Sequence, residues 1–153
     1  MENKKINSFF VVGISIRTTN ENNQSSNDIP LLWNKFMSEG LIQQIPNKID
    51  NTIYCIYTDY ESDFTKPYTT IIGCKVSNDE NIPVGMIGTQ INEGKYSINI
   101  AKGNIMQGMV YNEWIKIWNS KISRAYTTDF EVYGEKAQNP EDAEVEIFIA
   151  INK

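Results

Sequence analysis

Apolar and polar positions along the chain follow two periodicities, one typical of strands and one typical of helices. Residues 9–16 are rich in β-branched and aromatic side chains and predict a strand, which a polar loop over residues 18–27 follows. Asp28 then predicts a helix N-cap, with Pro30 in the first turn and Gly40 at the end of the helix. Four apolar residues of this helix recur at helical spacing and form one stripe: Leu32, Trp33, Phe36 and Met37.

Two further strands complete the first half of this pattern. Residues 52–58 and 68–76 are apolar and rich in β-branched side chains, and a polar turn at residues 61–63 joins them. The segment 78–94 contains several prolines and glycines, so it predicts a connection between the two halves of the chain.

The second half repeats the order of strand, helix, strand and strand. Residues 95–100 alternate apolar and polar side chains, so Tyr96, Ile98 and Ile100 share one face. A helix is predicted from residue 106 to residue 119, and strands are predicted over residues 127–133 and 144–151. The predicted buried stripe of the helix is Val110, Tyr111, Trp114, Ile117 and Trp118. The face of the last strand that suits packing against a helix is Val145, Ile147, Ile149 and Ile151.

This repetition predicts an α+β fold made of duplicated β-α-β-β units with pseudo-twofold symmetry and an antiparallel sheet. The repeats span about residues 8–77 and 94–152 of a single domain over residues 1–153. Each helix is expected to cover its own part of the sheet, and the two halves to meet along a groove. A groove at such a seam suits a ligand, although many duplicated domains fill it with side chains.

Composition excludes several classes of chemistry. The chain of 153 residues contains no histidine, which excludes a Ser-His-Asp triad and histidine-ligated zinc or haem. No glycine-rich phosphate loop is present, so we expect neither a metal nor a cofactor. The net charge of -5 argues against nucleic-acid or anionic-membrane surfaces. Cys55 and Cys74 lie inside predicted strands and are expected to be reduced core thiols in a cytoplasmic protein without a membrane span.

Glu131 is the candidate for specific chemistry. Within residues 129–133, strand alternation places Phe130 and Val132 on one face and Glu131 and Tyr133 on the other. Spacing alone favours an ordinary solvent-facing glutamate. The alternative is a carboxylate held among aromatic side chains, which is costly unless it is hydrogen-bonded or offered to a cation, and which would suit a lipophilic cation.

Several local patterns together resemble those of the GyrI-like, or AraC-type, effector-binding domains of bacteria, which include multidrug-sensing regulators of transcription. The resemblance covers nearly the whole chain. The segments that carry it are residues 54–63, Pro67-Tyr68, residues 72–76, residues 114–118, residues 129–133 and residues 146–151.

The resemblance implies two β-α-β-β units around a ligand groove. It also implies that Glu131 lies at the bottom of the pocket and pairs with cationic drugs or dyes, with aromatic residues as walls. Tyr133 and Phe148 are then expected to share the face of Glu131, and Tyr57, the repeat mate of Tyr133, to close the opposite wall. Two tryptophans also border the expected groove, although helical spacing favours core packing for both: Trp33 and Trp114.

The expected function is that of a stand-alone binding protein for lipophilic or aromatic, often cationic, small molecules. The first predicted strand begins within ten residues of Met1, so no DNA-binding helix-turn-helix is expected before it, and direct DNA binding is not expected. Two alternatives stay open. One is a hydrolase of strained electrophilic natural products that uses Glu131 as a general base. The other is an inhibitor that binds a protein partner such as DNA gyrase.

Overall fold

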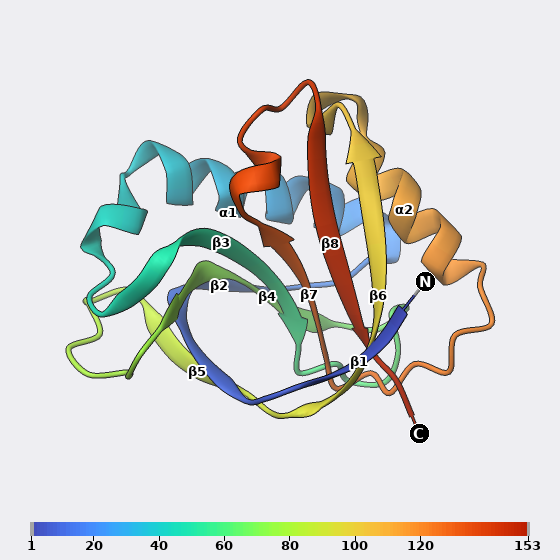
Figure 1. The fold of residues 1–153 in the computed structure, drawn as a ribbon, viewed down its shortest axis with the longest axis horizontal. Coiled ribbons are helices and arrows are strands. Elements are labelled where there is room, and N and C mark those ends of the chain that lie inside the picture. Colours follow the sequence, from blue (N-terminus) through green and yellow to red (C-terminus); the bar gives the residue numbers. More distant parts are fainter. Residues whose placement is uncertain (1, 153) are drawn as a thin grey trace.

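The computed structural model describes residues 2–152 as a curled antiparallel half-barrel sheet with two α-helices (Figure 1). The strands of the sheet are β1 (Glu2–Ile6), β2 (Phe9–Thr18), β3 (Lys48–Thr58), β4 (Tyr68–Val76), β5 (Ile87–Ile91), β6 (Gly94–Gly103), β7 (Thr128–Tyr133) and β8 (Ala143–Ala150). The helices are α1 (Gln24–Ser38) and α2 (Met109–Trp118), and short 3₁₀ helices span Glu21–Asn23, Leu41–Gln44, Ile105–Gln107 and Glu135–Ala137. The predicted α+β class is therefore confirmed.

The strand order β1-β6-β8-β7-β3-β4-β2-β5 makes the duplication visible. From the centre outward, β7, β8 and β6 of the second unit mirror β3, β4 and β2 of the first. The two units meet where β3 pairs with β7, and this pairing sets Cys55 opposite Glu131. The edge strands are exchanged between the units, because β1 pairs with β6 and β5 pairs with β2. The predicted pseudo-twofold arrangement is confirmed.

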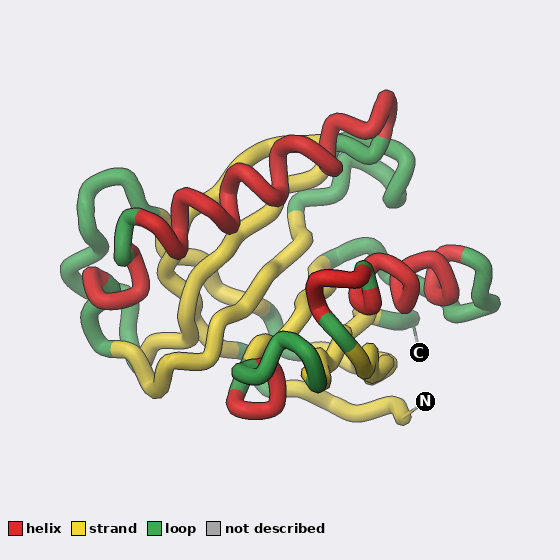
Figure 2. The backbone as a smooth tube through the Cα atoms, turned by 90° about the horizontal axis from the view of Figure 1, so that it is seen from above, coloured by secondary structure: helices red, strands yellow, loops and turns green. Residues whose placement is uncertain are grey.

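Both helices cover the same face of the sheet, one over each unit (Figures 1 and 2). Beneath α1 lies a cluster that includes Leu32 and Phe36, and beneath α2 lies another that includes Trp114 and Ile117. As predicted, Val145, Ile147 and Ile149 of β8 pack on the α2 side. The rings of Tyr57 and Tyr133 contact both clusters and so occupy the seam between the units.

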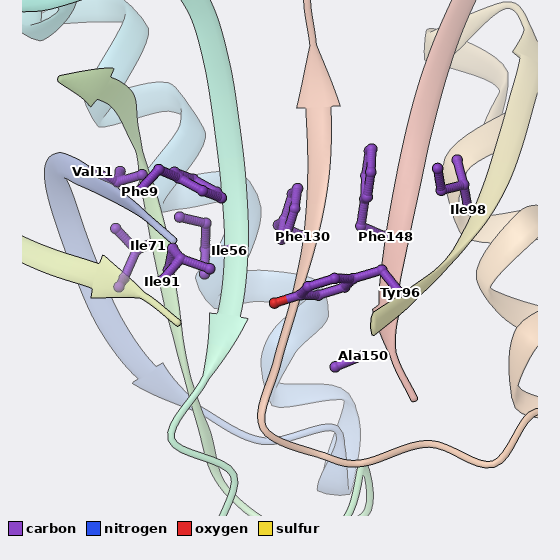
Figure 3. Close-up of a cluster of buried hydrophobic side chains, with 10 residues drawn as sticks. All are labelled: Phe9, Val11, Ile56, Ile71, Ile91, Tyr96, Ile98, Phe130, Phe148 and Ala150. Atoms are coloured by element: carbon purple, nitrogen blue, oxygen red, sulfur yellow. The ribbon is translucent and has the colours of Figure 1, made fainter. Parts of the chain in front are cut away.

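A third apolar cluster fills the opposite face of the sheet (Figure 3). Phe130 of β7 and Phe148 of β8 are direct partners in the strand pairing, and their rings stack with centroids 4.7 Å apart. Since successive side chains of a strand alternate faces, Glu131 next to Phe130 points toward the helices. The expectation that Phe148 shares the face of Glu131 is therefore wrong.

The start of α1 also differs from the prediction. The helix begins at Gln24, after Asn23 in a left-handed conformation, so Asp28 and Pro30 lie within the helix. Instead of capping, the Asp28 carboxylate accepts hydrogen bonds from Thr18 Oγ1 at 2.9 Å and from Gln24 Nε2 at 3.0 Å. Asp28 therefore ties the end of β2 to the first turn of the helix. The predicted end is confirmed, because Gly40 follows the helix with φ 61°.

The structure also differs from the prediction in the connecting segment, in the start of the second helix and in the exposure of some apolar residues. The segment 78–94 is more than a connection, since it contains the edge strand β5. In the second helix, a 3₁₀ turn and Gly108 with φ 77° precede Met109, so α2 begins three residues later than predicted. Three residues assigned to apolar faces are exposed: Met37, Ile100 and Tyr111. No helix within residues 2–152 has the length and apolar character needed to cross a membrane.

Candidate functional site

A pocket of about 300 Å³ lies between the two helices, above the central strand pair β3 and β7. The helices contribute Trp33 from α1 and Trp114 and Trp118 from α2. The strands between them contribute Tyr57, Tyr68, Glu131 and Tyr133. The volume is at the lower end of the range for small-molecule pockets, and the lining is mostly aromatic, as such sites usually are.

Glu131 is the buried acidic group of this pocket, with 2 % of its surface exposed. Tyr133 donates a hydrogen bond to Oε1 at 2.5 Å, and Tyr57 donates one to Oε2 at 2.8 Å. Trp114 Nε1 donates a third, also to Oε2, at 2.7 Å. The solvent-facing position that spacing alone favours for Glu131 is therefore wrong.

The electrostatic balance at Glu131 is incomplete. Burial raises the pKa of the Glu131 carboxyl, and the hydrogen bonds from Tyr133, Tyr57 and Trp114 oppose that rise without cancelling it. Within residues 2–152 no basic side chain forms an ion pair with this carboxylate. Three uncharged donors therefore orient the negative charge but do not neutralise it.

Aromatic contacts hold the donors of Glu131 in place. Trp33 packs edge-on against Tyr133 with centroids 4.9 Å apart, and Tyr57 packs edge-on against Trp114 with centroids 5.4 Å apart. Cys55 Sγ lies 3.4 Å from Tyr57 Oη and donates to it, which leaves the tyrosine proton directed at Glu131. Each donor is thus fixed by a second contact, so the arrangement is formed before any ligand enters.

One end of the pocket is built from the loops that follow β3 and α2. Tyr60 and Phe64 come from the first loop, and Arg124 comes from the second. Arg124 Nη2 forms an ion pair with Asp129 Oδ2 at 2.8 Å, and Tyr60 Oη donates to the same oxygen at 2.6 Å. Asp129 therefore joins both loops to the central strand β7.

Five of the six sequence-predicted site residues come together around this pocket: Glu131, Tyr133, Tyr57, Trp114 and Trp33. Phe148 does not, because it lies on the opposite face of the sheet. Helical spacing favoured core packing for the two tryptophans, but both also take part in the pocket. Trp114 is buried but also donates to Glu131, and Trp33 is half-buried at the pocket wall.

Sequence reasoning missed the loop residues of the pocket. Tyr60 and Phe64 flank the polar turn at residues 61–63, and two aromatic side chains in such a loop are a usable signal of a binding role. Arg124 carried no signal of this kind, since a single basic residue between a helix and a strand is ordinary in a sequence.

Comparison with known proteins finds similar sequences and folds. The family described as integron-associated effector binding protein, Cass2, matches residues 4–151. An integron cassette protein from the mobile metagenome of Vibrio cholerae, VCH_CASS2, is 35 % identical, with a TM-score of 0.76 over 99 % of this chain and 95 % of that protein.

One more distant relative and one protein of the same fold extend the comparison. YobU of Bacillus subtilis (strain 168), named as a candidate transcriptional regulator, is 26 % identical over 145 residues, which are 92 % of this chain and 91 % of YobU. SAV2435, whose structure was solved with bound tetraphenylphosphonium, is 18 % identical, with a TM-score of 0.81 over 99 % of this chain and 93 % of that protein. At that identity SAV2435 shows a common fold.

Proposed function

Because the chain belongs to the integron-associated effector-binding proteins, which have the GyrI-like fold and bind small molecules, we propose that its effector is a lipophilic aromatic monocation. The cation is bound above Glu131, between the aromatic side chains of α1 and α2. The carboxylate supplies charge recognition, and the rings supply contact area with little demand on ligand shape.

The contrast between two carboxylates of β7 carries this proposal. Asp129 and Glu131 are two residues apart, so they lie on the same face of the strand, and both are buried. Asp129 has a positively charged partner in Arg124. Glu131 has uncharged donors only, and it lines the pocket. A buried carboxylate is costly without a counter-charge, and a bound cation supplies one.

The aromatic walls favour the same ligand class. An ammonium or phosphonium centre over an aromatic face gains about 0.5–2 kcal/mol per ring, and most when the site is dry. The rings around the carboxylate contact one another. Trp33 packs against its donor Tyr133, and the other two donors, Tyr57 and Trp114, pack against each other. The tetraphenylphosphonium bound by SAV2435, a protein of the same fold, makes this cation the natural first probe.

The test is a calorimetric titration with tetraphenylphosphonium of the wild type and of Glu131→Gln. This substitution keeps the shape of the side chain and removes its charge, so we expect the affinity to fall by about tenfold to a hundredfold. Tryptophan fluorescence gives an independent readout, because three tryptophans line the pocket.

The matched control is Glu146→Gln, which makes the same charge change on the neighbouring strand. Glu146 is exposed and pairs with Val132, on the face of the sheet away from the helices. Its substitution is expected to leave the affinity within about twofold of the wild type. Equal affinities for the wild type and Glu131→Gln, with both folded by circular dichroism, would remove Glu131 from the site.

A further inference from the structure

Arg124 is unusually placed for an arginine. Its side chain is 5 % exposed, yet it lines the same pocket as Glu131. One terminal nitrogen, Nη2, is bound to Asp129. The guanidinium carbon lies 4.4 Å from the ring centre of Tyr126, 5.7 Å from that of Trp114 and 5.8 Å from that of Phe64. Burial is the largest single effect on Arg124 and lowers the pKa of its guanidinium, but the Asp129 carboxylate, Tyr60 and Tyr126 together raise this pKa above its ordinary value.

Two donors of this guanidinium are left without a hydrogen-bond partner. Nε and Nη1 are both buried, and neither has an acceptor within residues 2–152. Buried donors without partners are rare, because each loses its bonds to water and regains nothing. The rings of Phe64 and Trp114, which lie near the guanidinium carbon, also line the pocket. Because both donors are buried while Arg124 itself lines the pocket, a ligand reaches them only if the surrounding rings move.

We infer that Arg124 forms a second subsite of the pocket, which accepts a hydrogen-bond acceptor of the ligand through the Nε–H and Nη1–H groups. This inference rests on the proposed cation pocket and extends it. The acceptor is an uncharged oxygen such as that of a ketone, ester or amide. A carboxylate fits less well, since Asp129 already neutralises the guanidinium.

Trp114 relates the two subsites. Its Nε1–H group binds Glu131, and the centre of its ring lies 5.7 Å from the guanidinium carbon. The carboxylate and the guanidinium are therefore separated by one indole. The matching ligand carries its cationic centre and its carbonyl oxygen at opposite ends of a single aromatic ring that lies alongside Trp114.

The experiment compares two probes that differ in the acceptor alone: para-acetylphenyl-triphenylphosphonium and para-isopropylphenyl-triphenylphosphonium. The ratio of their affinities is measured by calorimetry for the wild type, Arg124→Lys and Arg17→Lys. Arg17 is exposed and does not line the pocket, but its guanidinium donates to the carbonyl oxygens of Asp59 and Pro67 in the loop after β3. Arg17→Lys therefore controls both for the change from arginine to lysine and for a looser loop. We expect the wild type and Arg17→Lys to prefer the acetyl compound by about threefold to tenfold, the value of one hydrogen bond. In Arg124→Lys this preference is expected to disappear, since lysine keeps the charge beside Asp129 but lacks the planar fork.

The outcomes separate this subsite from the cation pocket. One outcome would overturn the subsite alone. The wild type would bind both probes with equal affinity, and Glu131→Gln would weaken the binding of both. A preference that persists in Arg124→Lys would also overturn it. Binding of neither probe would overturn the cation pocket and the subsite together. Where Arg124→Lys does not fold, Arg124→Met combined with Asp129→Asn removes both charges of the pair and gives the same comparison.

Discussion

At the scale of single residues, the two units differ most at the position where they meet. Cys55 and Glu131 face each other across the central strand pair. Each is followed two residues later by a tyrosine, Tyr57 or Tyr133. Burial and the nearby Glu131 raise the pKa of the Cys55 thiol well above its usual value, so it stays a neutral donor. A second carboxylate at position 55 would repel the first. The asymmetry therefore leaves one negative charge at the centre of a symmetric pocket.

The protonation of Glu131 predicts how binding depends on pH. Burial raises the pKa of this carboxyl in the free protein, and a bound cation favours the ionised form. The affinity for tetraphenylphosphonium is therefore expected to be constant above this pKa and to fall as the pH drops through it. Well below it the fall approaches about tenfold per pH unit.

Calorimetry between about pH 8 and pH 4 measures this dependence, because pH 4 lies below even the ordinary pKa of a glutamate. Glu131→Gln is the control, whose residual affinity is expected to be flat over the same range. A wild-type affinity that does not change with pH would mean that the carboxylate does not carry the charge recognition.

At the scale of elements, a pair of glycines sets how closely β2 and β4 approach. Gly13 and Gly73 are direct partners in this antiparallel pairing. A Cβ atom added to Gly13 would lie 2.1 Å from the carbonyl oxygen of Ile72, and one added to Gly73 would lie 2.2 Å from that of Val12. Neither position has room for a methyl group. Glycines inside strands often mark a sharp bend, and here they lie in a curled sheet.

The substitution Gly13→Ala tests this close approach. We expect it to lower the free energy of unfolding by at least about 2 kcal/mol, because backbone atoms of β4 have to move. Urea denaturation measures the change. Ser15→Ala, at an exposed position of the same strand, is the control and is expected to change stability by less than about 0.5 kcal/mol. Equal stabilities of the two variants would show that the sheet relaxes around the added methyl group.

At the scale of the whole molecule, the pocket belongs to neither unit alone. Trp33 comes from the first unit, Trp114 from the second, and the tyrosines between them contact the apolar clusters of both. A ligand in this place links two helices that do not share an apolar cluster.

The hydrolase and protein-partner alternatives stay predictions. Product formation from a strained electrophile would favour the first, and a co-purified partner the second.

Hydrogen exchange measures this linkage. Saturation with tetraphenylphosphonium is expected to slow amide exchange in both α1 and α2, because a ligand held between the units opposes the opening of either one. At a hundred times the dissociation constant the stabilisation is about 2.7 kcal/mol. The edge strand β1 lies outside the pocket and is the internal control. Protection of one helix without the other would place the ligand on one unit only.

The sequence by itself determined the elements and their duplication. Alternation along residues 129–133 and the apolar face of β8 depend on neighbours one or two residues apart, so they are readable from one chain. The family resemblance, rather than spacing, indicated a buried Glu131. The edge strand β1 is not readable in this way because its partner β6 lies far along the chain. The first turn of α1 differs from the prediction because Asp28 accepts a hydrogen bond from Thr18 of the preceding strand instead of capping the helix.

Only the tertiary structure decided which faces meet and which charges are balanced. The register of β7 against β8 sets Phe148 beside Phe130 and so removes it from the pocket, and a shift by one residue would have reversed this. The loop after α2 brings Arg124 to Asp129, five residues along on β7, whereas Glu131 is left to uncharged donors, of which Tyr57 is 74 residues away. Electrostatic balance depends on distances between segments far apart in the chain, and no local pattern encodes those distances.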